Sequence, residues 1–397
     1  MTERGKVRVL HVITRLIRGG ADENTVFTVE GVDRSGYDSE ILAGCGSETT
    51  GFPSEIQRRT RVLPELVRDP HPVKDVVALV KMVRLFKRGR YDIVHTHTAK
   101  AGFLGRIAAR LAGVPHVVHT VHGVTFHDHI HPILRRLYVF LERVAARYCD
   151  VMITVGEDVK QKYLAAAIGR QAQYVTIPSG MDLTPFEIAR DAPAEGRAAL
   201  RHEFGFGHED LVVGMVSRLE PRKGYAYLIE AVARLAPDFP HLRVLVVGEG
   251  EQRAELVDLV VSSGLKERFK FAGYRSDIAE VISTFDVAVL TSLWEGLPRV
   301  LVQYAMLEKP IVSFEVEGSR EIIEDCHSGY VVPLKDVDSL VDRLRRLVSS
   351  PADRETFGRR VRERVEGRWN VELMVDRIRD LYDDVESGRP LTEKASV

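Results

Sequence analysis

Hydrophobic residues in this chain fall into short unbroken runs that are separated by stretches with helical spacing. The first run, Val7 to Thr14, is largely apolar, as is typical of a parallel strand that is buried on both faces. Further runs occur at 37–43, 61–64, 92–95, 114–120, 151–155 and 174–178, and then at 211–217, 243–248, 269–273, 286–290 and 311–314. Repetition of strand, helix and strand predicts doubly wound parallel sheets of the α/β class.

A chain of 397 residues is long enough for two such domains. The first is predicted over residues 1–182, where Ser179-Gly180-Met181-Asp182 forms a turn after the last strand of the first set. Residues 183–210 are rich in Ala, Arg, Glu and Gly and are predicted to be a linker with one short helix. The second domain is predicted over residues 211–368, and a final helix and tail over 369–397.

Composition excludes some function classes. The net charge of −1 argues against bulk electrostatic capture of nucleic acid. The widely spaced Cys45, Cys149 and Cys326 indicate free thiols in a reducing compartment. The amino terminus runs from charges into a strand without a signal-peptide core, and no apolar run approaches the length of a membrane span, so a cytoplasmic protein is expected.

Two segments, 73–88 and 133–148, are basic and amphipathic with helical spacing. They allow peripheral docking on a membrane surface. The favoured alternative is that each is the solvated face of an ordinary helix.

The most informative stretch is 291–332. Asp286 to Leu290 reads as a buried strand, and Pro298 is expected in the first turn of a helix, which leaves the amides of Gly296, Leu297 and their neighbours as an anion pocket. Glu295 precedes this pocket, and Gln303 lies roughly 7.5 Å further along the helix axis. A nucleoside diphosphate-sugar has this layout of hexose, diphosphate and ribose. The alternative is that Gln303 is a satisfied polar group in the core.

Other candidates also follow predicted strands. Arg218 and Lys223 leave one strand end together and are expected to clamp a diphosphate. Gly19-Gly20 follows the first strand, which puts backbone amides beside whatever binds there.

Five histidines are concentrated at the end of the strand at 114–120 and in the residues that follow it, and they invite a metal interpretation: His119, His122, His127, His129 and His131. The absence of nearby cysteine and of rigid ligand spacing argues against it, so no metal ligands are predicted. Asp336-Val337-Asp338 is expected to start a helix rather than to bind a metal.

These motifs resemble the donor site of the retaining glycosyltransferases of family 4 (glycosyl transferases group 1), which have the GT-B fold. That family carries two Glu residues separated by seven positions, and here the pair is Glu295 and Gln303. Arg218-Leu219 with Lys223-Gly224 is similar to the family's Gly-Arg-Leu and Lys-Gly, and Ser217 replaces the first Gly. Gly248-Glu249-Gly250-Glu251 resembles its Gly-x-Gly-Pro turn.

The resemblance implies a GT-B enzyme whose two Rossmann-like domains face a central cleft, with a last helix that crosses back to the first domain. It implies that His122 contacts the donor sugar near the anomeric carbon, that Glu295 holds sugar hydroxyls, and that Gln303 binds the ribose without charge. It also implies that Tyr274 and Arg275 lie at the nucleobase.

The expected activity is transfer of a sugar from a nucleotide-diphosphate sugar, with UDP-sugar as the expected donor, to an acceptor hydroxyl with retention and without a required cofactor. A sugar or lipid-linked saccharide of polysaccharide or glycolipid synthesis is the expected acceptor. Two alternatives stay open. One is a nucleotide-sugar epimerase or hydrolase on the same fold, and the other is a non-catalytic sugar-nucleotide-binding protein.

Overall fold

The computed structural model describes residues 6–17, 19–33, 36–127 and 130–391. The chain forms two compact units, which are described separately. The first comprises the chain up to Met181 together with the segment from Arg368 onward, and the second is Asp182–Gly367.

The first unit is built on a parallel sheet of seven strands in the order β3-β2-β1-β4-β5-β6-β7. Its strands are β1 (Val7–Ile13), β2 (Tyr37–Gly44), β3 (Thr60–Leu63), β4 (Ile93–His97), β5 (His116–Val121), β6 (Val151–Thr154) and β7 (Tyr174–Thr176). Its helices are α1 (Gly20–Asp33), α2 (Ser54–Arg59), α3 (Pro72–Gly89), α4 (Ala99–Ala112), α5 (Pro132–Ala146), α6 (Glu157–Ala165) and α16 (Val371–Glu386).

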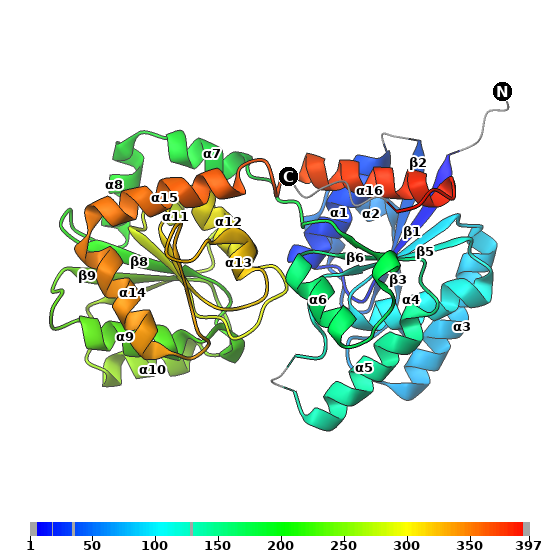
Figure 1. Cartoon of the computed structure of the whole chain (residues 1–397), viewed down its shortest axis with the longest axis horizontal. Helices are drawn as coiled ribbons and strands as arrows, with labels where there is room; N and C mark the ends of the chain where they lie inside the picture. Colours follow the sequence, from blue (N-terminus) through cyan, green and yellow to red (C-terminus); the bar gives the residue numbers. More distant parts are fainter. Residues whose placement is uncertain (1–5, 18, 34–35, 128–129, 392–397) are drawn as a thin grey trace. The chain divides into compact units, whose positions relative to one another are not determined.

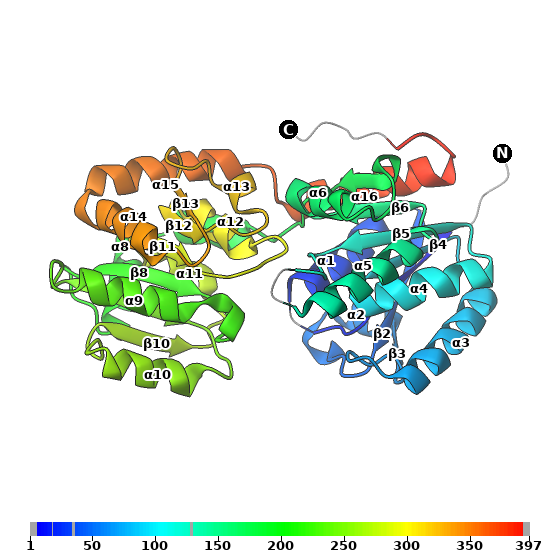
Figure 2. The same ribbon diagram turned by 60° about the horizontal axis from the view of Figure 1, so that its bottom comes forward.

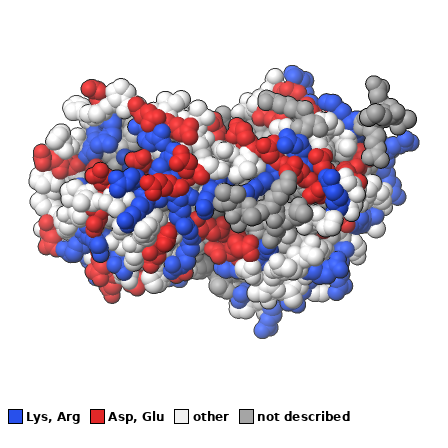
Figure 3. Space-filling model, turned by 45° about the horizontal axis from the view of Figure 1, so that its top comes forward, with Lys and Arg blue, Asp and Glu red and all other residues white. Residues whose placement is uncertain are grey.

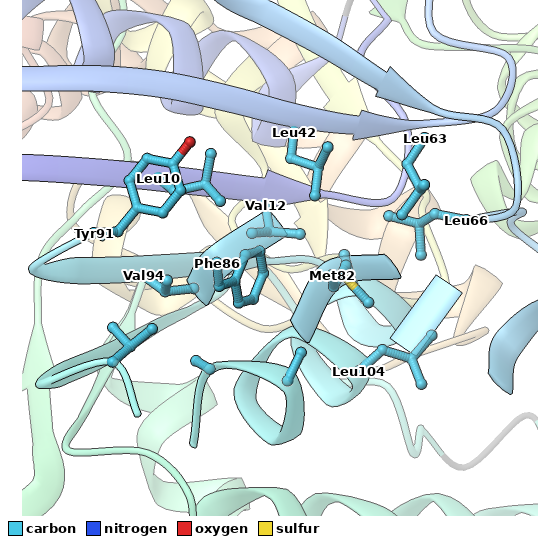
Figure 4. Close-up of a cluster of buried hydrophobic side chains, with 14 of the residues drawn as sticks. Leu10, Val12, Leu42, Leu63, Leu66, Met82, Phe86, Tyr91, Val94 and Leu104 are labelled. Carbon is cyan, nitrogen blue, oxygen red and sulfur yellow. The ribbon is translucent and has the colours of Figure 1, made fainter. Parts of the chain in front are cut away.

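Alternate residues of the central strands pack on opposite faces of this sheet, which explains why the strands are apolar throughout. Leu10 and Val12 of β1 pack with Met82 of α3 and Leu104 of α4 (Figure 4). On the other face, Val9 belongs to a cluster that includes α16 residues such as Ile378. Helices α1 and α16, which lie far apart in the sequence, run side by side on this second face (Figures 1 and 2).

The second unit has a parallel sheet of six strands in the order β10-β9-β8-β11-β12-β13. Its strands are β8 (Leu211–Val216), β9 (Leu242–Val247), β10 (Phe269–Gly273), β11 (Val287–Leu290), β12 (Ile311–Phe314) and β13 (Tyr330–Val332). Its helices are α7 (Thr184–Asp191), α8 (Ala194–Glu203), α9 (Tyr225–Leu235), α10 (Arg253–Ser262), α11 (Ile278–Ser283), α12 (Arg299–Met306), α13 (Ser319–Ile322), α14 (Val337–Ser349) and α15 (Pro351–Val365). The prediction of two doubly wound parallel sheets is confirmed.

Several local predictions were wrong. Strand β13 was missed because three residues are too short to show a period. Residues 183–210 contain two helices, α7 and α8, rather than one.

Asp336 does cap α14 through its side chain, as the expected helix start requires. None of the described helices is long and apolar enough to cross a membrane. Lys and Arg are interspersed with Asp and Glu on the face drawn in Figure 3. This mixture agrees with the near-zero net charge.

Candidate active site

The strand order reverses direction in the second sheet between β8 and β11, and ligands of open α/β sheets bind at such a point, outside the carboxyl ends of the strands. The loop after β8 carries Arg222 and Lys223, and the loop after β11 carries Thr291 to Gly296. Two hydrogen bonds to backbone carbonyls help to join these loops. The amide of Leu293 donates to the carbonyl of Arg222 at 2.8 Å, and the hydroxyl of Thr291 donates to the carbonyl of Lys223 at 3.1 Å.

Gly224 makes this close approach possible. Its φ is +65°, and a Cβ at this position would lie 2.1 Å from the carbonyl oxygen of Thr291. Only glycine meets both conditions without strain.

The joined loops bring four charged groups into contact. The ammonium of Lys223 donates to one carboxylate oxygen of Glu295, and the guanidinium of Arg222 lies 3.5 Å from the other. Arg222 also donates to Glu220 at 2.9 Å. Burial lowers the pKa of Lys223, and the carboxylate of Glu295 opposes that shift. A cation that is largely withdrawn from water interacts strongly with any further negative charge brought beside it.

Arg218 has a different environment from Lys223. Its side chain is 66% exposed and lies 3.0 Å from Glu220. Arg222, which sequence reasoning did not select, is the second cation beside Glu295. Its position directly before Lys223 was the available signal, but the contact with Glu295 spans 73 residues and could not be read from the chain.

The loop around Gly248 packs against the start of the loop after β8. Gly248 has φ +136°, and a Cβ there would lie 2.0 Å from the carbonyl oxygen of Ser217. The amide of Leu219 donates to the carbonyl of Glu249 at 2.9 Å. The glycine turn therefore shapes the Arg218 loop.

Tyr274 and Arg275 follow the neighbouring strand β10. Tyr274 is 68% exposed, as a stacking surface would be. Arg275 is already engaged, because its guanidinium contacts Asp277 at 2.5 Å and Glu203 at 2.9 Å.

The segment Gly296-Leu297-Pro298 leads into α12. Pro298 is the N-cap of this helix rather than a residue of its first turn, and the amide of Arg299 donates to the carbonyl of Leu297 at 2.9 Å. The expectation that every amide here is available to an anion was therefore wrong for Arg299. Gln303 is half-buried on α12, one to two turns beyond the helix start.

In the first unit, Gly19 precedes α1 and Gly20 is its first residue. The carbonyl of Gly19 accepts from the amide of Glu23 at 2.9 Å. His122 lies half-buried, one residue after β5.

The histidines that invited a metal interpretation lie in different environments. His119 is buried, whereas His131 is exposed and caps α5; His129 lies outside the described residues. The group whose ring nitrogens do come together, within 4.8 Å among the described residues, is instead His11, His95 and His97.

Residues 19–180 match the glycosyl transferase 4-like domain, and residues 196–364 match glycosyl transferases group 1. The chain is 30% identical over 384 residues to the UDP-Gal:alpha-D-GlcNAc-diphosphoundecaprenol alpha-1,3-galactosyltransferase of Escherichia coli, which covers 96% of this chain and 97% of that protein. The chain belongs to the glycosyl transferases group 1 family.

The protein is therefore a glycosyltransferase. It is also 22% identical over 361 residues to the capsular polysaccharide biosynthesis glycosyltransferase CapM of Staphylococcus aureus, over 89% of this chain and 92% of CapM. Among solved structures, HepE of Anabaena in complex with UDP superimposes with a TM-score of 0.81 at 21% identity, over 95% of this chain and all of that one. This likeness confirms the GT-B fold.

Proposed function

We propose that this glycosyltransferase takes a sugar from a UDP-sugar and transfers it, with retention, to a hydroxyl of a lipid-linked saccharide. The observation that carries the donor part is the ion pair of the buried Lys223 and the partly buried Glu295 at the reversal point of the second sheet. A diphosphate beside Lys223 would place its charge against a poorly hydrated cation. A hexose beyond it would meet the carboxylate of Glu295.

In this proposal Lys223 and Arg218 neutralise the diphosphate as charge grows on the leaving group, together with amides near Gly296. Such charge stabilisation is commonly the largest catalytic contribution. Because fixed cations supply it, the proposal requires no metal.

Orientation of the donor is assigned to other groups. Glu295 and His122 orient the sugar, Gln303 binds the ribose, and Tyr274 and Arg275 lie at the base. Gly248 shapes the donor loop, and Gly19 and Gly20 present backbone near the acceptor and the donor phosphate.

Two exposed apolar stripes of the first unit support a membrane-bound acceptor. On α3, Val73, Val76, Val77 and Val80 are 70%, 62%, 38% and 42% exposed, which is a spacing of one helix face. On α5, Ile133, Leu134, Leu137 and Phe140 are 67%, 45%, 46% and 60% exposed. The exposed charged residues of α5 are arginines, since its one acidic residue, Glu142, is buried against Arg106. An apolar stripe flanked by arginines suits an anionic lipid surface, and the E. coli relative acts on a diphosphoundecaprenol-linked sugar by its name.

The donor assignment is tested by calorimetric titration of UDP, GDP and ADP into the wild-type chain and into Lys223→Ala and Glu295→Ala. UDP should bind most tightly, and Lys223→Ala should weaken its binding at least tenfold. Glu295→Ala should leave UDP affinity within a few-fold but weaken the intact UDP-sugar, because the carboxylate addresses the sugar. Absence of nucleotide binding would overturn the proposal.

Turnover assays distinguish a transferase from a hydrolase or epimerase and from a binding protein. Product that appears from UDP-sugar without any acceptor would favour a hydrolase or epimerase, and no product with any acceptor would favour a binding protein. Retention is read from the anomeric configuration of the product by NMR.

The lipid assignment is tested by flotation with anionic liposomes. Ile133→Ser/Phe140→Ser should reduce association strongly. Ile188→Ser is a matched control, since Ile188 is 66% exposed on α7 of the other unit. No flotation of the wild-type chain would remove this part of the proposal.

A further inference from the structure

A chain of hydrogen-bonded imidazoles leads from the interior of the first unit to His122. Nδ1 of His11 lies 3.0 Å from Nε2 of His97, and Nδ1 of His97 lies 3.2 Å from Nε2 of His122. His11 and His97 are fully buried, whereas His122 is half-buried. The chain therefore connects a closed interior to the residue proposed to contact the sugar.

The sheet explains why these rings meet. Side chains two residues apart on a strand share a face, so His95 and His97 both point to the α16 side of β4. Strand β1 pairs with β4 so that His11 lies opposite His95. The strands flank the reversal point of the first sheet, and β5 then delivers His122 beside His97.

The inner rings are neutral. Burial lowers the pKa of His11 to about 3 and the pKa of His97 well below its usual value. A neutral imidazole has one N–H and one bare nitrogen. The location of the proton on one ring therefore determines its location on the next.

The innermost ring, that of His11, determines the direction in which the imidazole N–H groups point. Nε2 of His11 is buried and has no hydrogen-bond partner among the described residues. A buried N–H without an acceptor is the rarer of the two unpaired states, so the proton of His11 belongs on Nδ1, where it is donated to His97. His97 then carries its proton on Nδ1 and donates it to Nε2 of His122.

We propose that His97, oriented by His11, is a positioning residue that holds His122 in the Nδ1–H tautomer, so that the N–H group of His122 lies on the side away from His97. The sugar contact itself rests on the function proposed above. A fixed donor adds to rate because it is aimed before the reaction begins. The Nε2–H tautomer, which prevails for histidine in water, would instead offer the sugar a bare nitrogen.

His95 belongs to the same cluster of rings but is not one of the hydrogen-bonded imidazoles that lead to His122. Its Nδ1 lies 2.6 Å from the hydroxyl of Tyr382 and its Nε2 lies 2.7 Å from the hydroxyl of Thr120. It shares the strand, the face and the complete burial of His97. His95→Leu is therefore a matched control for His97→Leu.

Two-bond ¹H–¹⁵N correlation spectra report histidine tautomers directly. They are recorded on the full-length protein labelled with ¹⁵N-histidine, without substrate. The His122 signal is assigned by its loss in His122→Gln. In the wild type, Nδ1 of His122 should carry the proton and Nε2 should be bare. His97→Leu should change His122 to the Nε2–H form or an average. His95→Leu should leave the signal unchanged.

His97→Asn provides the rescue. An asparagine amide nitrogen can replace Nδ1 of the ring, so this variant should retain the wild-type tautomer. In turnover assays His97→Leu should lower kcat roughly tenfold to hundredfold, as expected when a reacting group loses its orientation, with the donor KM changed less than about threefold. His97→Asn should recover most of kcat, and His95→Leu should stay within about twofold of the wild type.

The decisive tautomer measurement is made on the wild-type protein, and His122→Gln serves only to assign its signal. A wild-type His122 with its proton on Nε2 overturns the proposal, and so does one equivalent of zinc in the purified protein that is lost in His95→Leu, because the cluster would then be a metal centre. Failure of UDP binding would instead overturn the proposed function and leave the tautomer result unaffected.

Discussion

The two sheets reverse direction at equivalent places, but the side chains gathered there differ in kind. At the reversal of the second sheet the groups are charged, with Lys223 and Arg222 around Glu295. At the reversal of the first sheet they are the neutral rings of His11 and His97. The same backbone arrangement therefore holds charged side chains in the second sheet and uncharged hydrogen-bonding side chains in the first.

The difference matches the two halves of the proposed donor. A diphosphate carries net charge that grows during transfer, so a fixed cation is the complementary group. A sugar carries none, so directional hydrogen bonds are worth more than charge. The two regions should therefore respond differently to acid and to the loss of single side chains.

The largest expected difference is in acid stability. Burial keeps four histidines of the first unit below their usual pKa, His11, His95, His97 and His119. The four histidines of the second unit are all exposed, His202, His208, His241 and His327. Between pH 6.5 and the lowered folded pKa the unfolded chain binds protons that the folded chain does not, so the stability of the first unit falls as pH falls. One such histidine lowers the free energy of unfolding by roughly 2 kcal/mol at pH 5.

Hydrogen exchange measured from pH 7.5 to pH 5, and corrected for the intrinsic rate, reports the two units separately. Protection of the β1, β4 and β5 amides should fall by several kcal/mol, while that of β8 and β11 changes little. A parallel loss in both units would contradict the contrast.

The next effect concerns rate. Lys223→Met should lower kcat/KM about 10³-fold, because the growing charge on the leaving group loses its buried cation. His122→Ala should cost about 10²-fold, since only a neutral hydrogen bond is lost. Initial rates with a fixed acceptor give both values. Arg218→Met is the control for a general loss of positive charge, and it should cost less than Lys223→Met because Arg218 is exposed. Equal losses for Lys223→Met and His122→Ala would mean that charge is not what distinguishes the regions.

A third effect concerns the backbone that supports the charged pair. Gly224→Ala combines a left-handed φ with a contact of 2.1 Å to the Thr291 carbonyl. It should lower the free energy of unfolding by roughly 2–4 kcal/mol and separate Lys223 from Glu295. Gly264→Ala is the matched control, since Gly264 has φ +71° with open space around it. Its expected cost is about 1 kcal/mol. Urea denaturation of the two variants separates the cost of the left-handed φ from the cost of the contact with the Thr291 carbonyl. Equal losses in the free energy of unfolding would show that the two loops can move apart freely.

Sequence patterns predicted both sheets because buried parallel strands are recognisable as apolar runs. They placed Lys223 and Glu295 at strand ends but could not show that the two side chains touch, since that contact depends on the hydrogen bonds between two loops. The pairing of His11 with His97 was missed for a similar reason. Alternation puts His95 and His97 on one face, but the register that brings β1 beside them is a property of the folded sheet. Which residues hold the substrate stays a prediction.

The smallest expected effect tests the residue that departs from the family pattern. Gln303 is an amide where the family has a second Glu, so its bond to a ribose hydroxyl would be neutral. Hydrogen bonds to a charged group contribute about 1 kcal/mol more than neutral ones, so Gln303→Glu should tighten UDP binding by up to about fivefold. Gln303→Met, which keeps the size but removes the acceptor, should weaken it by a similar factor. Calorimetric titration of UDP into both variants measures the difference. Unchanged UDP affinity in both variants would place Gln303 in the core rather than at the ribose. Weaker UDP binding in Gln303→Glu would show that a second carboxylate beside the Lys223 and Glu295 pair repels the diphosphate by more than its bond to the ribose contributes.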